Sequence, residues 1–189
     1  MQEPLPHRHA YLIMAHNEPE ILRVLVGLHD DPRNDIFIMI DKKADFNQFK
    51  DIHTEKSELV WSKRIDNRWD SFTNIEAEMM LMETAYNHDQ YRYFRLLSGV
   101  DLPLKTQDFI HDFFEKNDGK EFVEVRDDEE CRKHAWRYRF YHFFMRYYAS
   151  KRQIVRIVMR RLSDSLANLQ NHFGVWRHGD IFFKMGSVF

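Results

Sequence analysis

The stretch AYLIMAHNEPEILRVLVGLHDDPRNDIFIMID, residues 10–41, contains two short apolar runs with an amphipathic segment between them. Each run, 10–14 and 36–40, is continuous and short, which is typical of a strand buried on both faces. The segment between them has apolar residues at helical spacing, so its inner face is expected to carry Ile21, Leu22, Leu25 and Leu28. Asn17 is the expected N-cap, because Glu20 follows three residues later. The stretch therefore predicts a strand–helix–strand unit.

The alternation of strand and helix continues to residue 125. The further predicted helices are 45–53, a segment from Thr73 to about Asn87, and a segment that begins at Thr106 and ends at Gly119. The further predicted strands are 59–61, 93–97 and 121–125. The helix opened by the Thr73–Glu76 capping pattern is expected to turn inward Ile75, Met79, Met82 and Tyr86. These repeated units predict an α/β fold with a mostly parallel central sheet flanked by helices.

The character of the chain changes near residue 126, so we expect two parts, 1–125 and 126–189. Residues 131–163 contain ten Lys and Arg but no Asp or Glu. A helix predicted over 151–162 separates a basic stripe from an apolar stripe. The stripes are Arg152, Arg156 and Arg160, and Ile154, Val155, Val158 and Leu162. The same part of the chain has eight aromatic residues between Trp136 and Tyr148. Three interpretations stay open: the aromatic residues form a core and the arginines are solvated, the segment binds a phosphorylated or sugar substrate, or it contacts an anionic membrane.

Composition narrows the class of protein. The chain has 189 residues, 43% hydrophobic residues and a net charge of −2, which fits a large core and argues against a nucleic-acid-coating protein. A single cysteine, Cys131, excludes an internal disulfide and fits a reducing compartment. The first 20 residues contain only a five-residue apolar run, too short for a signal peptide or a transmembrane helix. We therefore expect a cytoplasmic protein, with peripheral contact at the inner membrane face left open.

Polar side chains follow the predicted strands at their carboxyl ends, where open α/β sheets bind ligands. The residues concerned are His16, Asp41, the loop 63–70, Ser98, Gly99 and Asp101. Asp41 is either a hydrogen-bond acceptor for a ligand, or a surface turn acid, or an acid paired with Lys42 or Lys43. Asp101 is either part of a ligand site or a turn-stabilising side chain.

Several common site motifs are missing from the sequence. Neither G-x-G-x-x-G nor G-x-x-x-x-G-K-[ST] occurs, which argues against NAD-binding Rossmann enzymes and P-loop NTPases. The chain has no Asp-x-Asp, and its histidines lack zinc-ligand spacing, so neither a metal nor another cofactor is expected. Asp180, after His178-Gly179, is a weak metal signal. No Gly-x-Ser-x-Gly occurs, and Cys131 has no identified base.

Four segments stand out in their order and spacing: AYLIMAHNEPEILRVLVGLHDDPRNDIFIMIDKKAD, NRWDSFTNIEAEMMLMETA, YFRLLSGVDLPLKTQDFIHDFF and GKEFVEV. Together they resemble the core-2/I-branching β-1,6-N-acetylglucosaminyltransferase family, glycosyltransferase family 14, which also contains the protein xylosyltransferases. The resemblance covers residues 9–125 well and 126–178 loosely. It implies a GT-A-like nucleotide-sugar-binding fold. It also implies a metal-independent, inverting transfer of a sugar, usually GlcNAc, from UDP to a hydroxyl of a glycan or another acceptor.

The resemblance also implies roles for individual residues. Ala15 and His16 would flank the uracil, Asp41 would bind the uridine, and Trp69 would lie against it. The complete set of implied donor-binding residues is Ala15, His16, Asp41, Trp69, Ser98, Gly99 and Asp101. The implied acceptor-binding residues are Glu124, Arg132, Lys133 and Trp136.

Three features depart from the pattern of this family. Asp70 replaces the glycine that follows Arg-Trp, and Met39 replaces a histidine in the second strand. The family's catalytic base, a Glu in a Pro-Asp-Glu-type motif, and the basic residues that neutralise the diphosphate would lie beyond Phe189. The catalytic residue is therefore unknown within this sequence. We expect either a fragment of a longer protein or a truncated form with impaired chemistry.

Two other functions stay open at this stage. One is a non-catalytic nucleotide-sugar or glycan-binding domain, and the other is a peripheral membrane scaffold. The sequence identifies neither the acceptor nor the oligomeric state, and it does not distinguish GlcNAc from xylose as the transferred sugar.

Overall fold

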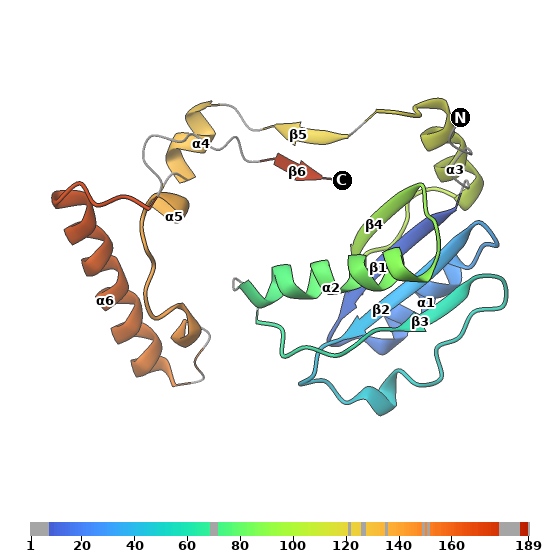
Figure 1. Cartoon of the computed structure of the whole chain (residues 1–189). Helices are drawn as coiled ribbons and strands as arrows, with labels where there is room; N and C mark the ends of the chain where they lie inside the picture. The colour runs from blue at the N-terminus through green and yellow to red at the C-terminus, as the bar shows by residue number, and fades with distance from the viewer. Residues whose placement is uncertain are drawn as a thin grey trace. The chain divides into compact units, whose positions relative to one another are not determined.

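A computed structural model describes residues 8–68, 72–120, 122–125, 128–134, 136–148, 150, 152–177 and 186–188. The chain divides into two compact units, Met1–Asn117 and Asp118–Phe189. Figure 1 labels the elements of both. The strands of the first unit are β1 (His9–Ala15), β2 (Asn34–Ile40), β3 (Glu58–Trp61) and β4 (Tyr93–Ser98). Its helices are α1 (Pro19–His29), α2 (Phe72–His88) and α3 (Gln107–Lys116), with one 3₁₀ turn, η1 (Phe46–Gln48).

The four strands form one parallel sheet in the order β3-β2-β1-β4. β1 is central, and Tyr11 lies opposite Ile36 on one side and Arg95 on the other. The α/β class and the parallel sheet predicted from the sequence are confirmed. The carboxyl ends of β1, β2 and β4 therefore meet at a single edge, which we call the carboxyl edge.

Side chains that alternate along β1 and β2 enter two different cores. Tyr11, Ile13 and Ala15 pack with Leu22, Leu25 and Val26 of α1 on one face of the sheet. Ala10, Leu12, Phe37 and Met39 pack with Ala77, Leu81 and Ala85 of α2 on the other. Figure 1 shows α1 and α2 on opposite faces of the sheet. Because both faces are covered, the strands need the continuous apolar runs seen in the sequence.

The first helices differ in detail from the prediction. α1 turns His29 inward with Leu22, Leu25 and Val26, whereas Leu28 is exposed. Its N-cap position is Glu18, which has a left-handed backbone and no capping side-chain bond, so the prediction of Asn17 as the cap was wrong. The helix predicted over 45–53 is only η1, in which Asp45 accepts a hydrogen bond from the Asn47 N–H.

The buried face of α2 was also predicted wrongly. Ala77, Leu81 and Ala85 are buried, while the four residues expected inward are exposed: Ile75, Met79, Met82 and Tyr86. Thr73 is not a cap, because it lies within the helix and its hydroxyl accepts a hydrogen bond from the Arg68 N–H. Small residues let α2 approach the sheet closely, which leaves its larger side chains outside.

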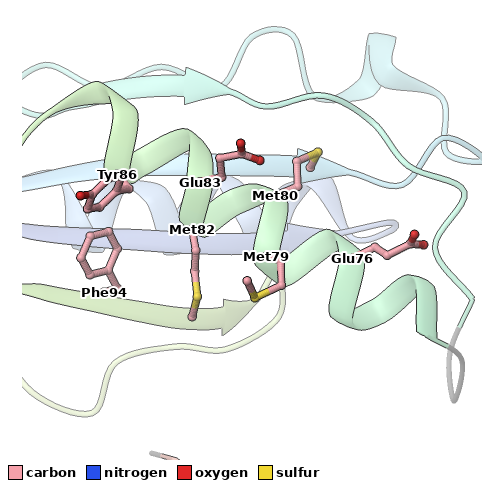
Figure 2. Close-up of a pocket in the computed structure, with 7 residues that line it drawn as sticks. All are labelled: Glu76, Met79, Met80, Met82, Glu83, Tyr86 and Phe94. Carbon is pink, nitrogen blue, oxygen red and sulfur yellow. The ribbon is translucent and has the colours of Figure 1, made fainter.

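The outward side chains of α2 line a hollow of about 720 Å³ beside β4. Figure 2 shows Tyr86 next to Phe94, with Met79 and Met82 projecting to the same side of the helix. Its lining residues are Glu76, Met79, Met80, Met82, Glu83, Tyr86 and Phe94. The hollow is therefore apolar, with two carboxylates at its margin.

The amino edge of the same sheet contains a buried histidine pair. The rings of His9 and His111 stack at a centroid distance of 4.0 Å, and Nε2 of His111 lies 2.8 Å from Oδ1 of Asn34. Both histidines are buried. Burial, with a smaller effect of Arg95, lowers the pKa of His9 to about 2, and burial with the nearby Arg33 lowers the pKa of His111 to about 4. Both rings are therefore neutral in the folded protein near pH 7.

The second unit contains α4 (Asp128–His134), α5 (Trp136–Arg139), η2 (Met145–Tyr147), α6 (Gln153–His172) and an antiparallel pair, β5 (Val123–Val125) and β6 (Gly186–Val188). α6 is longer than predicted, and Ser163 and Ala167 are its buried residues. Ile154, Val158 and Leu162 are exposed along it. Within the described residues, no helix is both long and apolar enough to cross a membrane.

Candidate functional site at the carboxyl edge

Three of the predicted donor-binding residues meet at the end of β1. The Asp41 N–H donates to the carbonyl of Ala15 at 2.8 Å, and the Gly99 N–H donates to the carbonyl of Met14 at 2.8 Å. A Cβ atom at Gly99 would lie 2.5 Å from the Cβ of Ala15 and 3.1 Å from its Cα. Only glycine therefore allows β4 to end directly against Ala15.

Asp41 is a buried carboxylate, 6% exposed, at the end of β2. Its Oδ1 accepts a 2.8 Å hydrogen bond from the backbone N–H of Lys43, and its Oδ2 lies 3.2 Å from Nζ of the same residue. The structure therefore contains the pairing of Asp41 with Lys43, which was one of the alternatives for this residue. Each carboxylate oxygen has two lone pairs, so this pairing leaves acceptor capacity for a ligand.

Lys43 also reaches the chain that follows β3. Its Nζ lies 3.0 Å from Oδ1 of Asp66 and donates to the carbonyl of Asn67. Burial alone would lower the pKa of Lys43, but hydrogen bonds to Asp66 and Asp41 outweigh it and raise the pKa above its usual value. Lys43 is therefore a cation near pH 7 and joins the loops that follow β2 and β3.

Asp101 stabilises the turn after β4. Its Oδ2 accepts a 2.8 Å hydrogen bond from the Ser98 N–H, and its own N–H donates to the Ser98 carbonyl at 3.0 Å. The turn-stabilising alternative for Asp101 is therefore present in the structure. Asp101 and Ser98 are both exposed beside Gly99, and His16 is exposed at the end of β1. Trp69 lies outside the described residues.

The predicted acceptor-binding residues lie in the second unit. Glu124 is in β5, opposite Ser187 of β6. Arg132 and Lys133 are exposed on α4, where Lys133 pairs with Glu129 at 2.9 Å. Trp136 begins α5 and is partly exposed, and its ring packs against Phe140 at a centroid distance of 5.1 Å.

Sequence reasoning missed one side chain at the carboxyl edge. The half-buried guanidinium of Arg64 donates to the carbonyls of Ile40 (3.2 Å), Asp41 (2.8 Å) and Ala44. A basic residue shortly after a short strand was a usable signal, because parallel neighbours bring their following loops together. Among the described residues, which do not include Asp180, no group of three or more His, Cys, Asp or Glu side chains is placed to hold a metal ion.

Comparison with known proteins identifies the family. A profile of the Core-2/I-Branching enzyme family matches residues 9–185, which covers parts of both units and every residue named at the carboxyl edge. A search of curated proteins gave no significant match. The match extends across most of the chain and agrees with the four-stranded parallel sheet. The chain therefore belongs to the Core-2/I-Branching enzyme family of glycosyltransferases.

Proposed function

We propose that this glycosyltransferase binds a UDP-sugar at the carboxyl edge and transfers the sugar, GlcNAc in the first instance, to an acceptor hydroxyl without a metal ion. The observation that carries the proposal is the buried carboxylate of Asp41, whose backbone N–H binds Ala15, the residue against which Gly99 packs. A buried carboxylate with free acceptor capacity suits the N–H of a uracil ring or the hydroxyls of a ribose. Its position at the end of β2 is where nucleotides bind in open α/β sheets.

The proposed reaction is a direct displacement at the anomeric carbon. The acceptor oxygen forms a bond to that carbon on the face opposite UDP, while the bond from the carbon to the diphosphate oxygen breaks. A general base takes the proton of the acceptor hydroxyl, and UDP leaves with the bonding electron pair. The configuration at the anomeric carbon is inverted. The described residues give no group that we assign as this base, so the proposal for this chain rests on donor binding.

Asp41→Asn is expected to raise the Kd for UDP about tenfold, because a charge-assisted hydrogen bond is replaced by a neutral one. The amide side chain of this variant keeps an oxygen that can accept from the Lys43 N–H, so the fold should be maintained. Isothermal titration calorimetry with UDP and UDP-GlcNAc, with and without EDTA, measures the effect.

The matched control for this change is Asp89→Asn. Asp89 is an exposed carboxylate that follows α2 and pairs with Arg8 at 2.6 Å. The Kd of the Asp89→Asn variant for UDP should equal that of the unchanged protein. If the folded protein does not bind UDP, the donor-binding proposal is wrong. If EDTA abolishes UDP binding, the proposed metal independence is wrong.

A further inference from the structure

The guanidinium of Arg64 fixes the backbone around Asp41 by hydrogen bonds to its carbonyl groups. Its Nε donates to the carbonyl of the last residue of β2, Ile40, and its Nη2 donates to the carbonyls of Asp41 and Ala44. The Ala44 N–H also donates to the Asp41 carbonyl, at 3.0 Å. One planar guanidinium thus closes the turn that presents the Asp41 side chain.

The backbone N–H of Asp41 is also fixed by a hydrogen bond. The Asp41 N–H is bound to Ala15, and the Asp41 carbonyl is bound to Arg64, so neither backbone group of this residue can turn freely. The carboxylate is fixed separately, by the N–H and Nζ of Lys43. A buried acceptor binds a ligand more tightly when its direction is set before the ligand arrives, because no ordering cost is then met on binding.

Arg64 and Lys43 also tie together two loops that are distant in sequence. Arg64 lies in the loop after β3 and grips the loop after β2, whereas Lys43 lies in the loop after β2 and reaches Asp66 and Asn67. A backbone bond of 2.9 Å from the Lys42 N–H to the Ile65 carbonyl lies between them. These contacts therefore hold the described parts of the loops after β2 and β3 against each other.

We infer that Arg64 is a positioning residue for the donor nucleotide, because it fixes the backbone of Asp41 and the loop after β3. Lys43 has the same role. This inference rests on the proposed binding of UDP at the carboxyl edge. Lysine cannot replace Arg64, because an ammonium group is a point donor and does not present the rigid fork that spans these carbonyls.

The test is calorimetric titration of UDP into Arg64→Lys. We expect the Kd for UDP to rise about tenfold while the number of UDP bound per chain stays at the value of the unchanged protein. A purely structural role would lower that number, through the unfolded fraction, and leave the Kd of the folded fraction unchanged. Arg23→Lys, a half-exposed arginine of α1 that bridges Glu20 and Asp51, is the matched control and should leave the Kd unchanged.

A second variant pair is less liable to disturb folding. Lys43→Gln should raise the Kd severalfold, whereas Lys42→Gln, an exposed neighbour in the same loop, should not change it. If the unchanged protein binds UDP, and Arg64→Lys and Lys43→Gln both bind UDP with the Kd of the unchanged protein, the positioning role is wrong and the donor site stands. If the unchanged protein binds no UDP, the donor site itself fails.

Discussion

Gly99→Ala is expected to raise the Kd for UDP more than about a hundredfold and to lower the free energy of unfolding by about 1–3 kcal/mol. The added methyl carbon would lie 2.5 Å from the Cβ of Ala15, closer than two such atoms can approach. Since Ala15 also accepts the hydrogen bond of the Asp41 N–H, its displacement shifts the carboxylate as well. Calorimetric titration measures the first effect, and urea denaturation measures the second.

The matched control is Gly27→Ala in α1. A Cβ atom at Gly27 has no neighbour within 4 Å, so alanine should stabilise the helix by about 0.5–1 kcal/mol and leave the Kd unchanged. The double variant Ala15→Gly with Gly99→Ala removes the closest of the clashing contacts and should recover part of the UDP binding. Equal Kd values for Gly99→Ala and the unchanged protein would show that the end of β4 does not shape the donor site.

The free energy of unfolding is expected to fall by about 2–3 kcal/mol between pH 7 and pH 4.5 through His111 alone. Its pKa is about 4 in the folded protein and near the usual 6.5 in the unfolded chain, so the unfolded state binds the proton first. This contribution is therefore intact above pH 6.5 and is lost progressively as the pH falls toward 4. His9, with a pKa of about 2, and buried His29, with a lowered pKa, act in the same direction.

The charged groups around His111 set the pH window for the measurement. Arg33 and Arg95 lower its pKa, and Asp31 and Asp108 raise it. The pKa of Asp31 is itself lowered, to about 2, chiefly by its hydrogen bond from Arg33, so Asp31 stays ionised in the folded protein above pH 4.5. Urea denaturation between pH 7 and pH 4.5 therefore reports the histidines.

A pair of glutamine variants separates His111 from the other histidines. His111→Gln should reduce the pH dependence of the unfolding free energy, with the share due to His9 and His29 remaining, and His53→Gln, at an exposed position, should leave it as it is. A free energy that is constant between pH 7 and pH 4.5 in the unchanged protein would contradict the burial of a neutral histidine pair.

The sheet was predictable because its signal is local. The runs at 10–14 and 36–40 are apolar on both faces, and the strands they form are covered by α1 and α2. The face of α2 was not predictable in the same way, because large apolar residues and small ones occupy different sides of the helix. Periodicity favoured the larger set, whereas close packing on the sheet favours Ala77, Leu81 and Ala85.

The candidate site was predictable only in part. The residues that end strands, Asp41 and Gly99, could be placed because parallel strands present their carboxyl ends at one edge. The contacts of Arg64 with three carbonyls could not, since they depend on how two loops fold over each other. The sequence left the pairing of Asp41 with Lys43 and the turn role of Asp101 open as alternatives, and the structure contains both.

The most direct test is to map backbone amide shifts by NMR while UDP is added in the presence of EDTA. If UDP binds at the carboxyl edge, the largest shifts occur at Ala15, His16, Asp41 and Gly99, with little change at His9, Asn34 and Tyr93 on the amino edge. Shifts concentrated at the amino edge or along α2, or no shifts in a folded sample, would contradict nucleotide binding at the carboxyl edge.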